Sequence, residues 1–327
     1  MRYCDFEKGF TKRFYPYKEL TEKDIEGIRI LKWIAAIILM LSCAIFAYVC
    51  KSYELFWITI TISILLMLCL IYLIVSKPIR LLYLAGWIIS RNIKPTGPFL
   101  DVEKFFPNHK YFIDKKNFES IKKEVLRILP YRYKLPLTKY TFNGQNNYIG
   151  SDIDGTQRDD QDGWRIMMVS IGRKISDGGR KNFPKLSKLI ERCPEILSCA
   201  VSILPGRKGI PIHIGYYKGI LRYQLGVVIP KDKKNCFICV NGEKYNWSSG
   251  KDVMFDDTFA HKVYNNTGEI RVVIYMDIAR PFLPDGLCEF NEYILRIFEN
   301  NSSVQNEISR TEYQVDLVES NNINDIN

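Results

Sequence analysis

The sequence lacks the motifs that mark several large enzyme classes. It contains no G-x-S-x-G nucleophile motif and no H-E-x-x-H zinc motif, and the G-K at 250–251 is not preceded by a phosphate-binding loop. Cys236 and Cys239 have C-x-x-C spacing, but there is no second pair, and their apolar neighbours predict a strand. These absences argue against a serine hydrolase of the G-x-S-x-G type, a zinc protease, a nucleotide hydrolase and a zinc finger.

Histidine is also scarce, since the 327 residues include only three. Two of them, His213 and His261, fall in predicted strands and are followed downstream by Arg222 and Arg271. Neutral imidazoles bind redox metals, and guanidinium groups bind carboxylates through paired hydrogen bonds. The pattern therefore indicates a two-histidine metal centre with two arginines that could hold a dianionic cosubstrate.

Charged residues are absent from two apolar stretches near the N-terminus, at 33–50 and 55–76. Each approaches the roughly 20 residues that a helix needs to cross a bilayer. The net charge of +10 alone would suit nucleic acid or an anionic membrane surface. Because of the apolar stretches we predict a transmembrane hairpin, with spans at about 30–50 and 55–76, and no nucleic-acid partner. Two buried helices of a soluble protein are the less favoured alternative.

Basic residues lie on both outer sides of the predicted hairpin, whereas its connecting loop carries Lys51 alone. The positive-inside rule places basic flanks in the cytosol. We therefore predict an integral membrane protein with two spans, in contact with the lipid bilayer and with its catalytic domain in the cytosol. The basic residues of the flanks are Arg2, Lys8, Lys12, Arg13, Lys18, Lys23 and Arg29 before the hairpin, and Lys77, Arg80, Arg91 and Lys94 after it.

Composition divides the chain into consecutive parts. Residues 1–29 are predicted to form a cytosolic N-terminal segment, and 30–76 the hairpin. Residues 77–98 form a basic juxtamembrane segment, which either lies on anionic headgroups or is an ordinary linker. Residues 99–285 form a globular domain, and 286–327 a short helix followed by a polar tail that is predicted to be disordered.

The globular domain is predicted to be rich in strands. Helices are expected at 116–128 and 184–192, and a polar loop rich in aspartate and glycine at 145–163. Between about 197 and 280, turn signals such as Pro205-Gly206 recur at short spacing. Short strands separated by such turns predict a mainly β fold, a sandwich or jelly roll with flanking helices.

Side chains alternate between the two faces of a strand, so the candidate residues can be assigned to faces. Within 210–215, His213 is predicted to face away from Ile210. Within 221–225, Arg222 and Gln224 share one face. A three-residue loop at 265–267 would pair the strands around it and place His261 directly across from Arg271.

Each candidate has a plain structural alternative. A single buried histidine can be a satisfied core residue, and a single arginine can belong to a structural ion pair. Four such residues on inward faces of one strand region favour a binding site, because buried polar groups are costly without a partner. Asp256 or Asp257 could orient His261 from behind, or could form a turn.

Several blocks of the sequence carry a family resemblance. They are S-I-L-P-G at 202–206, I-H-I-G at 212–215, L-R-Y-Q-L-G at 221–226, F-D-D-T-F-A-H at 255–261 with an arginine downstream, and D-I-A-R-P at 277–281. These blocks resemble the aspartyl/asparaginyl β-hydroxylase family, over about residues 99–283. The G-W-R at 163–165 and the stretch at 99–107 are more similar to its membrane-bound lipid hydroxylases. The resemblance implies a double-stranded β-helix (jelly roll, cupin-like) at 99–285 and a dioxygenase that uses iron(II), 2-oxoglutarate and O2.

The resemblance also assigns roles to single residues. His213 and His261 would bind the iron. Arg271, with Ser202, would hold the distal carboxylate of 2-oxoglutarate, and Arg222 would hold the end that binds the iron.

Two positions depart from common patterns. Gly215 stands where a facial triad has its carboxylate; the family's protein hydroxylases share this glycine, whereas its lipid hydroxylases tend to have aspartate there. Gln224, counted with the cosubstrate-binding residues, stands where the family usually has histidine. It can form hydrogen bonds but cannot be cationic, so altered cosubstrate binding is expected.

The activity implied by the resemblance is hydroxylation of an unactivated C–H bond. We favour a lipid acyl chain as the substrate because of the predicted membrane anchor. β-Hydroxylation of Asp or Asn in a protein, which Gly215 favours, is the first alternative. A non-catalytic protein that binds 2-oxoglutarate on the same fold is the second.

Overall fold

The computed structural model describes residues 22–49, 51–76, 79–135, 139–142, 145–148, 163–215 and 217–299. The described chain forms two compact units. One comprises residues 94–215 and 219–299, and the other comprises residues 22–93 with 217–218. The first 21 residues, most of the predicted loop at 145–163 and the tail from residue 300 lie outside the described residues.

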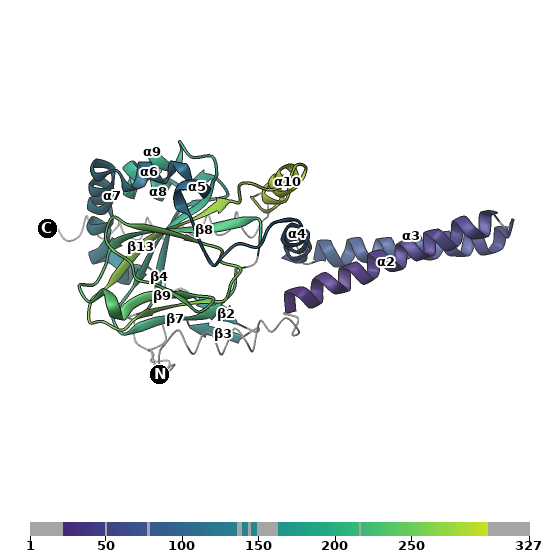
Figure 1. The fold of residues 1–327 in the computed structure, drawn as a ribbon, viewed down its shortest axis with the longest axis horizontal. Helices are drawn as coiled ribbons and strands as arrows, with labels where there is room; N and C mark the ends of the chain where they lie inside the picture. Colours follow the sequence, from purple (N-terminus) through teal and green to yellow (C-terminus); the bar gives the residue numbers. More distant parts are fainter. Residues whose placement is uncertain are drawn as a thin grey trace. The chain divides into compact units, whose positions relative to one another are not determined.

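The smaller unit consists of helices α2 (Glu22–Val49), α3 (Tyr53–Ser76) and α4 (Ile79–Asn92). Helices α2 and α3 pack along each other and are joined by a tight turn in which Lys51 has a left-handed backbone conformation, with φ of 56° (Figure 1). Large apolar side chains of these two helices, such as Phe46, Trp57 and Tyr72, are exposed.

The structure corrects the predicted membrane topology. Among the described residues, none of the helices combines the length and the apolar character that a membrane crossing requires. In α2, charged residues extend from Glu22 to Lys32 and leave an uncharged part shorter than the roughly 20 residues that a crossing needs. The prediction of an integral membrane protein with two spans is therefore wrong. The predicted cytosolic placement of the catalytic domain depended on those spans and has lost its basis.

Short helices open the larger unit. Asp101 and Asp114 cap two of them by accepting hydrogen bonds from the amides of Lys104 and Asn117. The elements are β1 (Phe99–Leu100), α5 (Val102–Phe105), η1 (Pro107–His109), α6 (Lys110–Ile113), α7 (Lys115–Ile128) and η2 (Leu129–Lys134). The helix predicted at 116–128 is confirmed as α7, because its apolar side chains recur at helical spacing and are buried.

The remaining helices also agree with the sequence patterns. The helix predicted at 184–192 corresponds to α9 (Pro184–Ile190), and α8 (Asp177–Asn182) precedes it. The helix predicted after residue 285 is α10 (Leu287–Glu299). A separate hairpin, β2 (Lys139–Phe142) and β3 (Gln145–Tyr148), begins the predicted polar loop.

Two antiparallel sheets form the centre of this unit. The larger sheet has the order β1-β11-β8-β13-β6-β4-β5 and the smaller sheet the order β10-β9-β12-β7. Besides β1, the larger sheet consists of β4 (Arg165–Ile171), β5 (Lys174–Ile175), β6 (Ile196–Leu204), β8 (Ile220–Val228), β11 (Asp252–Phe255) and β13 (Arg271–Ala279). The smaller sheet consists of β7 (Lys208–His213), β9 (Cys236–Val240), β10 (Glu243–Tyr245) and β12 (His261–Asn265). A 3-10 turn, η3 (Lys233–Asn235), precedes β9.

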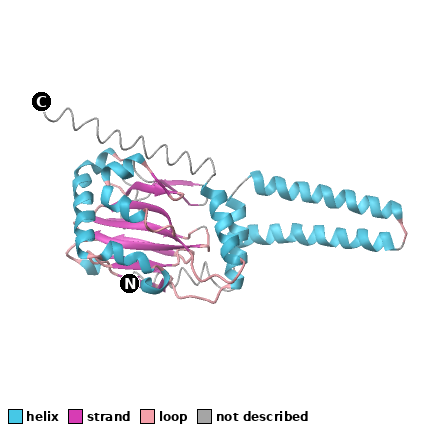
Figure 2. Ribbon diagram, turned by 90° about the horizontal axis from the view of Figure 1, so that it is seen from above, coloured by secondary structure: helices cyan, strands magenta, loops and turns pink. Residues whose placement is uncertain are grey.

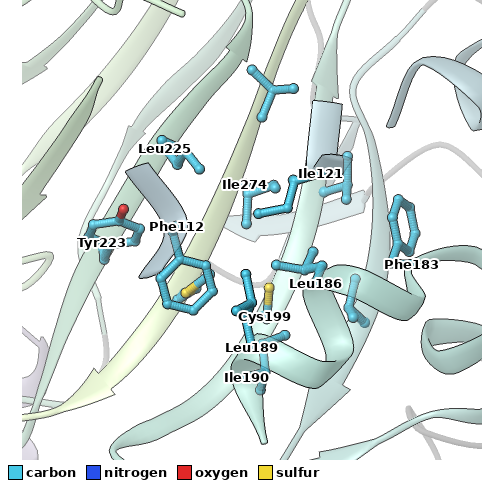
Figure 3. Close-up of a cluster of buried hydrophobic side chains, with 14 of the residues drawn as sticks. Phe112, Ile121, Phe183, Leu186, Leu189, Ile190, Cys199, Tyr223, Leu225 and Ile274 are labelled. Atoms are coloured by element: carbon cyan, nitrogen blue, oxygen red, sulfur yellow. The ribbon is translucent and has the colours of Figure 1, made fainter. Parts of the chain in front are cut away.

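The larger sheet has a core on each of its faces. On one face, side chains of β6, β8 and β13 pack against α6, α7 and α9, as the cluster around Phe112, Ile121 and Leu186 shows (Figure 3). On the other face a second cluster joins strands of both sheets. Within this unit, Figure 2 shows the helices (cyan) lying against the strands (magenta). The prediction of a mainly β fold with flanking helices is confirmed, and the structure adds that the strand pairs are antiparallel.

A β-bulge in β7 overturns one predicted face. The pairing of β12 with β7 runs from His261 opposite His213 to Val263 opposite Ile210, so β7 contributes one extra residue. An extra residue shifts the alternation of side chains by one position. As a result Ile210 and His213 line the same cavity, whereas strict alternation predicted opposite faces.

The predicted pairing across 265–267 is also wrong. Strand β12 pairs with β7 and β9, whereas β13 pairs with β6 and β8 in the other sheet. The connection at 266–270 therefore carries the chain from one sheet to the other. His261 and Arg271 still line one cavity, but from different sheets.

Candidate metal and cosubstrate site

The two candidate metal ligands lie side by side in the smaller sheet. His213 ends β7, and His261 begins β12 directly opposite it in the antiparallel register. Their ring centroids are 4.0 Å apart and the ring planes are inclined at 54°. The ring of Phe255 packs against His261 at a centroid distance of 5.3 Å. Pairing of the strands therefore brings together two imidazoles that are 48 positions apart in the chain.

A backbone contact shows which ring nitrogen of His261 carries a proton. Its Nδ1 lies 2.8 Å from the carbonyl oxygen of Phe259. A carbonyl oxygen can only accept, so Nδ1 carries a proton, and in the neutral ring the lone pair is then on Nε2. This is the tautomer of a metal-binding histidine. The suggested carboxylate partners instead contact arginines: Asp256 pairs with Arg280, and Asp257 with Arg222.

A cavity between the two sheets contains all six predicted site residues. It contains about 420 Å³ of non-atom space, part of which is open solvent. The larger sheet and the segment before β4 contribute Trp164, Ser202, Arg222, Gln224, Phe255, Arg271 and Tyr275, and the smaller sheet contributes Ile210, His213, Ile238, His261 and Val263. Sequence reasoning did not assign Trp164, Tyr275 or the apolar side chains to the site, although Trp164 lies in the G-W-R block of the resemblance.

Arg271 is a buried cation without an acidic partner. It is 1 % exposed, and burial lowers the pKa of its guanidinium to about 10. The guanidinium carbon lies 4.8 Å from the ring centroid of Trp247, and NH1 donates a long hydrogen bond of 3.4 Å to Ser202 Oγ. In the part of the chain that the structure describes, Arg271 forms no ion pair and its Nε has no hydrogen-bond acceptor. Such a charge is costly unless an anion joins it.

Arg222 is in the opposite situation. Its Nε and NH2 each lie 2.8 Å from Asp277 Oδ1, and NH2 lies 3.3 Å from Asp257 Oδ2. Asp277 Oδ2 also accepts a hydrogen bond of 2.6 Å from the Ser198 hydroxyl. Burial alone would lower the pKa of Arg222, but the two carboxylates more than offset it and raise the pKa. Arg222 is therefore neutralised by the protein, whereas the sequence assigned it to a cosubstrate carboxylate.

Gln224 lies beside Arg271 with one end of its amide engaged. Its Oε1 accepts a hydrogen bond of 3.1 Å from the indole Nε1 of Trp247. Ser202 is engaged in a similar way, because Trp164 Nε1 donates a hydrogen bond of 2.8 Å to its Oγ. Both side chains thus face the cavity with groups that remain able to donate.

Space beside Gly215 is taken by Asp257. A Cβ atom at position 215 would lie 2.3 Å from the carboxyl carbon of Asp257, and the amide of Gly215 donates a hydrogen bond of 2.6 Å to the Asp257 carbonyl oxygen. A side chain at the position where a facial triad has its carboxylate would therefore require the Asp257 carboxyl group to move.

The donor set fits a metal that binds few protein ligands. Within the described ranges, no group of three His, Cys, Asp or Glu side chains comes together as a metal site. Two imidazoles suit iron(II), and its remaining positions would then be open to a chelating cosubstrate and oxygen. The uncompensated charge of Arg271 in the same cavity suits an anionic group on that cosubstrate.

Comparison with known proteins agrees with this site. Residues 115–281 match the family model described as Aspartyl/Asparaginyl beta-hydroxylase. The chain belongs to the aspartyl/asparaginyl beta-hydroxylase family. The matched region includes all six predicted site residues, and the predicted family is confirmed. The expected enzyme class, a hydroxylase, agrees with this membership.

Two relatives in this hydroxylase family differ in substrate. An ornithine lipid ester-linked acyl 2-hydroxylase of Rhizobium tropici is 28 % identical over 168 residues, which is 51 % of this chain and 56 % of the relative. The human aspartyl/asparaginyl beta-hydroxylase is 32 % identical over 136 residues, 40 % of this chain and 17 % of the relative. The chain thus spans little more than half of the first relative and less than a fifth of the second.

Solved structures offer a weaker comparison. A prolyl hydroxylase from Trichoplax adhaerens, in complex with a peptide fragment, is 15 % identical, covers 69 % of this chain and 96 % of its own, and has a TM-score of 0.37. A likeness of this size carries no argument about function. Family membership therefore depends on the sequence match.

Proposed function

We propose that this protein is an iron(II)- and 2-oxoglutarate-dependent hydroxylase with a double-stranded β-helix domain at about residues 99–285. The observation that carries the proposal is the cavity between the sheets. It combines two adjacent imidazoles, His213 and His261, with a buried guanidinium, Arg271, that has no acidic partner among the described residues. A metal site and an anion site in one cavity are what a chelating keto acid requires.

His213 and His261 would hold the metal. The hydrogen bond from His261 Nδ1 to the Phe259 carbonyl holds one proton on Nδ1, so that Nε2 would be the metal-binding nitrogen. When bound with 2-oxoglutarate and O2, the iron would supply the oxidising chemistry that turns a C–H bond into C–OH. Ile210, Ile238 and Val263 add an apolar lining beside this centre.

Arg271 and Ser202 would hold a carboxylate of 2-oxoglutarate. The guanidinium offers planar donors that match a carboxylate, and the stack on Trp247 fixes its plane. Gln224 would contribute a neutral donor beside them. We propose that Arg222, bound by Asp277 and Asp257, acts as a fixed structural cation in this cavity instead of binding the cosubstrate directly.

For the substrate, we favour a lipid acyl chain. The relative from Rhizobium tropici is named as a lipid acyl 2-hydroxylase. In addition, Arg222 and Arg271 are the arginines of the cavity; Arg271 is reserved for the cosubstrate and Arg222 is already neutralised. The described part of the site thus has no uncompensated cation left for an aspartate side chain, and a neutral group suits it better.

β-Hydroxylation of Asp or Asn in a protein is the second candidate. The human relative is named for it, and Gly215 matches the pattern of the family's protein hydroxylases. A neutral Asn side chain would also suit a site that has no uncompensated cation left for the substrate. A non-catalytic 2-oxoglutarate-binding protein is the third, although an intact histidine pair supports an enzyme.

Two measurements separate these candidates. Purified protein incubated with iron(II), 2-oxoglutarate, O2 and extracted lipids should release succinate in proportion to hydroxylated lipid. Mass spectrometry of lipids and proteins from cells with and without the gene should show one added oxygen on an acyl chain. A gain of oxygen confined to Asp or Asn residues would reject the lipid substrate. Binding of 2-oxoglutarate without succinate release under any condition would support the non-catalytic alternative.

A further inference from the structure

The hydroxyl of Ser202 is oriented by two groups that can only donate. Trp164 Nε1 donates to Ser202 Oγ at 2.8 Å and Arg271 NH1 donates to the same atom at 3.4 Å. A serine oxygen has two lone pairs and one proton. With both lone pairs occupied, the O–H proton is left for a third direction. Among the described residues no acceptor takes it, and Ser202 lines the cavity.

The amide of Gln224 is oriented in the same way. Trp247 Nε1, also a donor only, lies 3.1 Å from Gln224 Oε1. A flipped amide would place its NH2 group against the indole N–H in a buried site, which is unfavourable. The NH2 end of Gln224 therefore points away from Trp247, and no described residue accepts its protons.

The two indoles come from segments outside the strands of the site. Trp164 directly precedes β4, and Trp247 lies between β10 and β11. Trp247 is fully buried and its ring also supports the guanidinium of Arg271 at 4.8 Å. Two separate connecting segments thus place an indole N–H against the polar side chains of one cavity. Ser202 and Gln224 each keep a donor group for a ligand.

We propose that Trp164 and Trp247 are positioning residues that set the hydrogen-bond polarity of the cavity. Their N–H groups occupy the acceptor atoms of Ser202 and Gln224, so that the polar groups around Arg271 present donors to the ligand: the Ser202 O–H, the Gln224 NH2 and the guanidinium itself. Such a cavity selects a ligand that presents only acceptors, a fully ionised dicarboxylate, over one that carries an amide. This inference rests on the proposed function and extends it from cosubstrate binding to cosubstrate discrimination.

The test compares two ligands in equilibrium binding without turnover. Calorimetry with manganese(II)-loaded protein measures the affinity for 2-oxoglutarate and for its C5 monoamide. The variants Trp247→Phe and Trp164→Phe keep an aromatic ring but remove the N–H. Each should weaken 2-oxoglutarate roughly tenfold, because Gln224 or Ser202 can then turn an acceptor toward the carboxylate. The preference for 2-oxoglutarate over the amide should fall as well, because a turned acceptor can receive the amide N–H.

A further variant distinguishes a change in hydrogen-bond polarity from a simple loss of packing. Gln224→Glu is isosteric, accepts from Trp247 with either oxygen, and places an acceptor in the cavity. It should fold like the parent in circular dichroism and lose at least hundredfold in 2-oxoglutarate affinity. Tyr245→Phe is the matched control, since the Tyr245 hydroxyl donates to the Asp252 carbonyl at 3.0 Å and does not line the cavity. It should leave both affinities unchanged.

The outcomes separate this inference from the proposed function. If the parent protein fails to bind 2-oxoglutarate, the proposed function is wrong. If the parent binds it but the two tryptophan variants keep the full preference over the amide, the polarity role is wrong and the proposed function stands. A uniform loss of both affinities would likewise reject the polarity role and leave the tryptophans as packing residues.

Discussion

The carboxyl group of Asp257 occupies the space that a side chain at position 215 would need. A Cβ atom there would lie 2.3 Å from the Asp257 carboxyl carbon and equally close to Oδ1, far inside van der Waals contact. Gly215 is therefore favoured by crowding from the Asp257 side chain, since its φ angle is not in the left-handed region. Position 215 thus lacks the carboxylate of a facial triad, and the carboxyl group of Asp257 fills the space that such a side chain would occupy.

Substitution at this glycine should damage the site instead of completing it. Gly215→Asp and Gly215→Ala both push Asp257 aside and separate it from Arg222, at a cost of about 1–3 kcal/mol in unfolding free energy. Urea denaturation measures the loss. Gly268→Ala is the control, because a Cβ at 268 has no neighbour within 4 Å and should change stability by less than about 0.5 kcal/mol. If Gly215→Asp were as stable as the parent and bound iron more tightly, the crowding argument would fail.

Loss of either candidate ligand should abolish iron binding. With two imidazoles as the protein ligands, His213→Ala and His261→Ala leave a single one, and anaerobic titration with iron(II) should show no stoichiometric site. The third histidine provides a control. His109 Nδ1 lies 2.7 Å from Asp252 and Nε2 2.9 Å from Glu103, outside the cavity, so His109→Asn should lower stability but keep the metal stoichiometry. Iron bound at full affinity by both alanine variants would remove the metal assignment.

Arg271→Met should have opposite effects on binding and stability. Loss of the guanidinium should weaken 2-oxoglutarate by about 3 kcal/mol, more than hundredfold in Kd. Removal of a buried, uncompensated charge should stabilise the ligand-free protein by about 1–3 kcal/mol, because methionine fills a similar volume without a desolvation cost. Calorimetry and urea unfolding of the same preparation measure the two effects. A less stable variant would show that Arg271 holds the fold together.

Asp277 should matter more to stability than its neighbour Ser198. Asp277→Asn removes a charge that binds Arg222 through two contacts of 2.8 Å, and we expect a loss of about 1–3 kcal/mol. Ser198→Ala removes one hydrogen bond and keeps the ion pair, so its loss should be about 1 kcal/mol. Equal losses in the two variants would contradict the assignment of Arg222 as a fixed structural cation.

Alternation along strands predicted part of the site correctly. Arg222 and Gln224 share the cavity face of β8, while Leu221 and Tyr223 enter the helix-side core, as a period of two requires. In β7 the same rule failed, because the bulge is defined by pairing with β12. Pro211 is typical of a bulge or an edge strand, but it does not fix the register. Register between strands is a property of two segments, and the sequence of one segment does not contain it.

The difference between the two arginines could not be predicted either. Arg222 is paired because Asp277 lies directly across from it in β13, and Asp257 reaches it from the loop after β11. Arg271 lies in the same strand as Asp277 but at its opposite end. Trp164 and Trp247 were missed for a related reason: they lie in connecting segments, where no periodicity assigns a side chain to a face.

The unpaired charge of Arg271 also has a consequence for the amount of protein that a cell maintains. A ligand that binds only the folded chain stabilises it, by about 2.7 kcal/mol when its concentration is a hundred times its Kd. Where marginal folding stability sets the unfolded fraction that proteases remove, a loss of this size changes abundance several-fold. Scarcity of 2-oxoglutarate would then lower the total activity in two ways. Less cosubstrate would slow turnover, and the ligand-free protein would be degraded faster.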